Sequence, residues 1–81
     1  MNHFIYRQSF GITSFDIINK YNEKIGKIVF NAEQNKYGWI TDRTPVYITE
    51  EQTEEILDKL KFLNKNKNLS YTEKIKLLNR D

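Results

Sequence analysis

The chain has 81 residues, a length that fits one domain with a small hydrophobic core. Hydrophobic residues make up 38% of it, aromatic residues 14% and charged residues 30%, and this balance favours a folded protein over a disordered chain. The absence of cysteine excludes a disulfide framework and a thiolate zinc site, and a net charge of +2 is too small to indicate nucleic-acid binding by itself.

The first predicted element lies near the N-terminus. Phe4 and Tyr6 alternate with polar neighbours, which predicts a strand within residues 3–10. Arg7 and Gln8 interrupt this stretch where a signal peptide needs an unbroken apolar run, and no later segment is as long as a membrane span. We therefore expect a cytoplasmic protein that has no membrane partner.

Two further strands are predicted from a two-residue period. In SFDIINK, residues 14–20, Phe15 and Ile17 lie on one side and Asp16 on the other. In IGKIVFN, residues 25–31, apolar and polar side chains alternate in the same way. The polar YNEK between the two segments predicts a turn between antiparallel partners.

KYGWIT, residues 36–41, predicts another strand after the polar turn NAEQN. The following DRTP ends it, because Pro45 has no N–H to donate to a ladder. VYI, residues 46–48, is compatible with a short edge strand. These segments together predict an antiparallel β-meander of three to five strands.

The hydrophobic period changes at Thr49. Thr49 and Gln52 have the capping-box spacing, the first turn is acidic, and a stripe of apolar residues follows at helical spacing. Ser70 and Glu73 repeat the capping-box spacing before a shorter apolar stripe. The predicted fold is therefore α+β: a single domain over residues 1–81, β-rich at 3–48 and helical at 49–80, with one long amphipathic helix and a short C-terminal helix.

Tyr37 and Trp39 share one face of their predicted strand, and that face has two interpretations. In the first, the long helix packs against it and the rings are core, since large aromatics dominate small cores. In the second, the rings are exposed anchors for a partner, since Tyr and Trp are enriched at interface hot spots. The second interpretation makes Tyr37, Trp39, Arg43 and Tyr47 the candidate partner-binding residues.

Catalytic and metal-binding patterns are weak. His3 is the only histidine, and the sequence has no His/Cys cluster, no Gly-rich phosphate loop and no Gly-x-Ser-x-Gly elbow. The carboxylate pairs that start the long helix are explained by the helix dipole. We therefore expect no enzymatic activity, no cofactor and no metal site.

The charged segments allow three further hypotheses. Glu51, Glu54 and Glu55 form an acidic stretch that could mimic nucleic-acid phosphate in the basic groove of a partner. Lys61, Lys65 and Lys67, together with exposed rings on the sheet, could bind single-stranded RNA or DNA. An unpaired sheet face, or the edge strand near Val46, could instead join two copies into a homodimer.

The stretches NEKIGKIVFNAEQNKYGWIT and VYITEEQTEEILDKLKFLNK resemble a strand–strand–helix pattern of small, cysteine-free, Lys/Asn/Ile-rich proteins carried by phages and mobile elements of low-GC bacteria. The resemblance brings no catalytic residue. It implies a non-enzymatic protein, located in the cytoplasm of a bacterial host, that inhibits a larger host or defence protein such as a CRISPR effector by stoichiometric binding.

Overall fold

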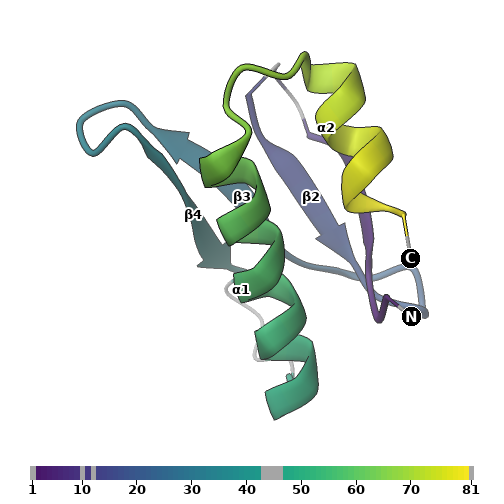
Figure 1. The fold of residues 1–81 in the computed structure, drawn as a ribbon. Coiled ribbons are helices and arrows are strands. Elements are labelled where there is room, and N and C mark those ends of the chain that lie inside the picture. The colour runs from purple at the N-terminus through teal and green to yellow at the C-terminus, as the bar shows by residue number, and fades with distance from the viewer. Residues whose placement is uncertain (1, 10, 12, 43–46, 81) are drawn as a thin grey trace.

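The computed structural model describes residues 2–9, 11, 13–42 and 47–80 (Figure 1). Its elements are β1 (Ile5–Gln8), β2 (Phe15–Ile18), β3 (Lys24–Asn31), β4 (Lys36–Thr41), α1 (Glu50–Lys65) and α2 (Tyr71–Leu78). The strands form one antiparallel sheet in the order β1-β2-β3-β4. The predicted α+β class, a meander followed by a long and a short helix, is confirmed.

One predicted strand is not formed. Tyr47 and Ile48 lie outside any strand, so the expectation of an edge strand at residues 46–48 is wrong for these two positions. Val46 lies outside the described residues. The last described strand is therefore β4, and it forms an edge of the sheet.

The two helices begin where their caps predict. Thr49 closes a complete capping box, because its hydroxyl accepts from the backbone N of Gln52 at 3.1 Å and its own N–H donates to the Gln52 side chain at 3.0 Å. The Ser70 hydroxyl accepts from the backbone N of Glu73 at 3.2 Å. No helix among the described residues combines the length and the apolarity that a membrane crossing requires.

Both helices lie on the same side of the sheet (Figure 1). α1 packs against β4, and α2 packs against β1. The core lies between the two helices and the side of the sheet that they cover, and it comprises Phe4, Tyr6, Phe15, Ile17, Ile25, Ile28, Tyr37, Ile56, Leu63 and Leu78. We call this side of the sheet the covered face and the other side the open face.

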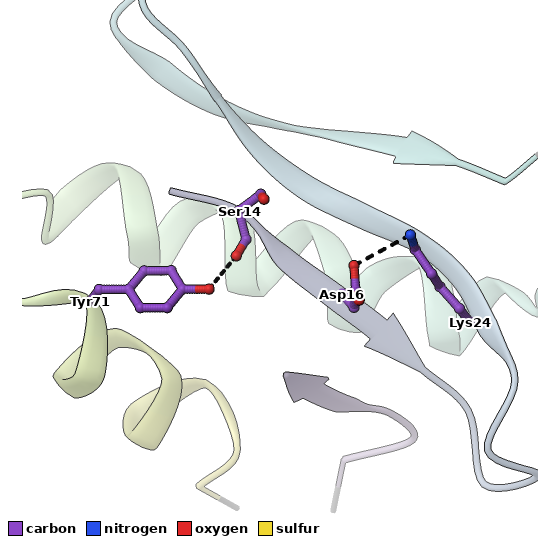
Figure 2. Close-up of polar contacts among 4 residues, drawn as sticks. All are labelled: Ser14, Asp16, Lys24 and Tyr71. Atoms are coloured by element: carbon purple, nitrogen blue, oxygen red, sulfur yellow. Dashed lines mark hydrogen bonds and ion pairs between the residues drawn. The ribbon is translucent and has the colours of Figure 1, made fainter. Parts of the chain in front are cut away.

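Tyr71 of α2 fixes the second helix to the core. Its ring stacks on Phe15 with 4.8 Å between centroids and an interplanar angle of 14°. Its hydroxyl donates to the backbone oxygen of Ser14, just before β2 (Figure 2). Burial is the main reason why the pKa of Tyr71 is raised above its ordinary value.

A β-bulge adjusts which side chains of β3 reach the core. Ile17 pairs with Gly26 but Ile18 pairs with Lys24, so Ile25 is an extra residue on β3. Ile25 is buried with the core, although strict alternation along β3 would place its side chain on the other face of the sheet from Gly26. Lys24 forms an ion pair with Asp16 of β2 at 3.5 Å (Figure 2).

Candidate functional site

Tyr37 belongs to the core. Only 8% of the residue is exposed, and its ring contacts Phe15 and Phe30 at centroid distances of 6.2 and 5.1 Å. Its hydroxyl accepts from Nζ of Lys74 at 3.0 Å. The interpretation of Tyr37 as an exposed anchor is therefore corrected, because β4 turns this ring toward the helices.

Trp39 is also on the covered face, where it is partly buried and packs against the core. Its indole lies over Gly26, since a Cβ at Gly26 would come within 3.0 Å of Nε1. That nitrogen is shielded from solvent and has no hydrogen-bond partner. Trp39 therefore fits the core interpretation rather than the contact interpretation.

The other two residues of the predicted contact site do not restore an aromatic patch. Tyr47 is 88% exposed but comes after the end of β4, and Arg43 lies outside the described residues. The structure thus separates the exposed Tyr47 from the buried Tyr37 and the packed Trp39.

Glu55 of the predicted acidic site ties the N-terminal segment to α1. Its carboxylate accepts from the backbone N–H groups of His3 and Phe4, the latter at 3.2 Å, and from the hydroxyl of Tyr6 at 2.7 Å. Burial, assisted by this hydrogen bond and by the charge of Glu55, raises the pKa of Tyr6. Glu55 reaches these partners across about fifty residues of sequence, so the spacing of residues along the chain could not reveal that it holds the N-terminal segment.

Beside this contact lies a groove of about 290 Å³. It is lined by Asn2, His3, Glu51, Glu54, Glu55, Asp58 and Lys59. Glu51 and Glu54 are exposed at its rim. Within the described parts of the chain, no three His, Cys, Asp or Glu side chains are grouped so that they could hold a metal ion.

The predicted nucleic-acid lysines lie apart from the rings they would need. Lys61 and Lys65 are exposed on α1, and Lys67 donates to the backbone oxygen of Asn35 in the turn between β3 and β4. The rings of Tyr37 and Trp39 are on the covered face, beneath the helices. The structure therefore does not bring these lysines and rings onto one surface.

The open face of the sheet carries a different chemistry. Ile5 of β1 is 54% exposed and Ile40 of β4 is 50% exposed, and neither belongs to the core. The cross-strand register places Arg7, Asp16, Lys27 and Ile40 in one row across the four strands. Ile5 and Ile40 are thus half exposed beside charged side chains on a face that neither helix covers, whereas Ile18, which pairs with Ile5, is buried (Figure 1).

The open face is basic. Arg7, Lys24 and Lys27 lie near the carboxylate of Asp16, which is already paired with Lys24. Arg7 is exposed and Lys27 is partly exposed, so both can reach a partner. The sequence signal for this face was present in the alternation of β4, where Ile40 opposes Trp39, but the aromatic rings drew the prediction to the other side.

Comparison of the chain with protein-family models, with curated proteins and with solved structures gives no match in any of the three.

Proposed function

We propose that this chain is a non-enzymatic binding protein that inhibits or modulates a larger protein by occupying part of its surface. The observation that carries the proposal is the open face, on which Ile5 and Ile40 are about half exposed beside Arg7 and Lys27. Exposed apolar side chains bordered by charges are typical of protein interaction sites. The complementary surface is acidic with apolar pockets.

The position of the rings favours a protein partner over a single-stranded nucleic acid. Binding of single strands relies on aromatic side chains that stack on the nucleobases and on Lys and Arg side chains that contact the phosphates. Here the open face offers isoleucines, and the strand aromatics Tyr6, Phe15 and Tyr37 are buried beneath the helices. An aliphatic and basic surface suits the side chains of a protein better than the flat faces of bases.

The same reasoning disfavours the acidic helix start as a phosphate mimic. Glu55 directs its carboxylate to His3, Phe4 and Tyr6 and is thereby committed to the fold. Only Glu51 and Glu54 of the predicted acidic contact remain exposed. The nature of the target, a host or defence protein such as a CRISPR effector in the bacterial cytoplasm, is proposed from the resemblance to phage proteins alone.

A pair of matched double variants tests the proposal. Arg7→Thr with Lys27→Thr removes two positive charges from the open face while keeping residues that favour strands. Lys61→Gln with Lys65→Gln removes two charges from α1 while keeping residues that favour helices. Capture of partner proteins from a bacterial lysate should fall at least about tenfold for the first pair, because a few contact residues, arginine prominent among them, carry most of the binding energy of an interface. It should stay unchanged for the second pair.

Circular dichroism of both double variants controls for folding. The proposal is contradicted if the open-face pair retains its captured partner while the α1 pair loses it. Fluorescence anisotropy with a labelled single-stranded oligonucleotide is the companion measurement. Binding that weakens steeply with added salt and depends on Lys61 and Lys65 would replace the proposal with nucleic-acid binding.

A further inference from the structure

The two edges of the sheet are protected to different extents. Edge strands present N–H and C=O groups that can pair with another chain. On β1, the side chain of Asn79 occupies the edge at Tyr6: Oδ1 accepts from the backbone N at 2.8 Å, and Nδ2 donates to the backbone O at 2.7 Å. The Glu55 carboxylate takes the N–H of Phe4 at 3.2 Å. Side chains from the helical layer thus close the β1 edge through Tyr6.

On β4, the side chain of Asn64 pairs with the strand edge in the same way at Tyr37. Oδ1 of Asn64 accepts from the backbone N of Tyr37 at 2.7 Å, and its Nδ2 donates to the backbone O at 3.5 Å. This contact shows that the backbone groups of Tyr37 point away from β3. The backbone N of Asp42 donates to the backbone O of Ile25 on β3 at 3.0 Å. The backbone groups of even-numbered residues therefore point toward β3, and those of odd-numbered residues point away from it.

By this alternation, Trp39 and Thr41 also direct their N–H and C=O groups away from β3. Within the described parts of the chain, neither backbone forms a hydrogen bond outside the ladder. The C-terminal half of the β4 edge is therefore an open row of donors and acceptors, in contrast to the closed position at Tyr37.

Apolar side chains border this open row on both sides. Ile40, between the two free positions, is 50% exposed on the open face. Leu57 of α1 is 46% exposed and lies seven residues before Asn64, so about two helical turns place both on the side of α1 that meets β4. An added strand would cover apolar surface as well as pair its backbone.

We propose that the free half of β4 pairs with the same segment of a second copy, antiparallel and across a two-fold axis at Ile40. Trp39 of one copy then lies opposite Thr41 of the other, and both exchange their free N–H and C=O groups. Ile40 meets its own counterpart, and Gly38 meets Asp42, so no like charges stand opposite each other. Because these pairings make the segment complementary to its own copy, a second copy of the chain is the partner that fits this edge.

This inference uses the edge of the sheet and assigns Ile40 to the contact between two copies, so that Ile5, Arg7 and Lys27 remain for the partner proposed for the open face. Pairing of two edges makes one continuous sheet that carries two open faces side by side. A target with two acidic sites, or a dimeric target, would then be bound with a gain in avidity.

Sedimentation analysis from low micromolar to millimolar concentration tests the pairing. The wild type should pass from monomer to dimer. Thr41→Pro removes an N–H that points outward, so it should abolish the dimer and leave the ladder with β3 intact. Gln8→Pro is the matched control, because Gln8 has the same outward parity on the other edge strand as Tyr6, and it should dimerise like the wild type.

A second pair of variants covers the case in which a proline variant fails to fold. Ile40→Lys places like charges opposite each other at the two-fold axis and should raise the dissociation constant at least about tenfold. Ile5→Lys makes the same change at a similarly exposed position of the open face on β1, and it should leave the dissociation constant of the dimer unchanged. A wild type that stays monomeric at millimolar concentration overturns the inference, and so does a dimer that survives Ile40→Lys. The Arg7→Thr, Lys27→Thr protein should dimerise like the wild type even if it no longer captures a partner. Its dimerisation therefore distinguishes failure of the edge pairing from failure of the proposed function.

Discussion

The covered face and the open face of one sheet differ in what their side chains contact. On the covered face, Phe15 is fully buried and stacks on Tyr71 with 4.8 Å between centroids. On the open face, Ile5 and Ile40 are about half exposed near Arg7. In a chain of this length the aromatic rings supply core volume, so the face that the helices leave uncovered is aliphatic and basic.

Truncation of one large side chain on each face gives the largest contrast. Phe15→Ala should lower the free energy of unfolding by about 3–5 kcal/mol, because it removes a fully buried ring and leaves a cavity. Ile5→Ala should cost about 1 kcal/mol or less, because more than half of that residue is already exposed. Urea denaturation of both variants measures the difference, and equal losses would contradict the division between the faces.

Two glycines on opposite faces provide the next comparison. A Cβ at Gly26 would lie 2.4 Å from the backbone oxygen of Ile40 and 3.0 Å from Nε1 of Trp39, whereas a Cβ at Gly38 would meet nothing within 4 Å. Gly26→Ala should therefore cost about 1–3 kcal/mol or more through overpacking. Gly38→Ala should be neutral or stabilise by up to about 1 kcal/mol, since alanine restricts the unfolded chain.

Thermal melts of the two glycine variants provide the readout. A destabilised Gly38→Ala protein would show that the open face is packed against something at this position. An unaffected Gly26→Ala protein would show that Trp39 does not lie over β3.

Two lysines provide a third comparison. Lys74 is buried on the covered side, where Nζ donates at 3.0 Å both to the hydroxyl of Tyr37 and to the backbone oxygen of Lys67. Lys74→Met keeps the aliphatic stem but leaves those acceptors unpaired, at a cost of about 1–3 kcal/mol. Lys27→Met on the open face should change stability by no more than about 0.5 kcal/mol. A larger loss of stability for Lys27→Met than for Lys74→Met in chemical denaturation would contradict the placement of Lys74 in the buried layer.

The smallest effect is expected from pH. Because the pKa of Tyr6 is raised in the folded state, its contribution to stability is complete below the ordinary tyrosine value of 10.0 and is lost as the pH rises above it. At about pH 10.5 the loss should be less than about 1 kcal/mol from this residue. Tyr6→Phe should flatten the alkaline part of the stability profile. An unchanged profile would show that Tyr6 does not hold its proton more tightly when folded.

The sequence predicts the elements better than their arrangement. The capping box at Thr49 and Gln52 and the two-residue period around Phe15 are local signals, and both elements form as expected. Local signals could not show which face the helices cover, because β4 carries apolar side chains on both sides. The bulge at Ile25 breaks the alternation without a sequence mark of its own.

The polar contacts that protect the edges of the sheet were also beyond local reasoning. Asn79 reaches Tyr6 across 73 residues, and Asn64 reaches Tyr37 across 27. An asparagine that pairs with an edge strand looks like any other asparagine near a helix end until the fold brings the two together. The expectation of exposed rings is therefore wrong for Tyr37 and Trp39, where tertiary packing, rather than local pattern, decides exposure.

Acrylamide quenching of tryptophan fluorescence tests the division between the faces most directly, because Trp39 is the only tryptophan of the chain. The matched reference is a Trp39→Phe, Ile5→Trp protein, whose tryptophan replaces an exposed side chain on the open face and lies away from the proposed dimer seam. We predict blue-shifted, weakly quenched emission from the wild type and red-shifted, readily quenched emission from the reference. Equal quenching of the two proteins, with both folded, would contradict the account and return Trp39 to the contact surface.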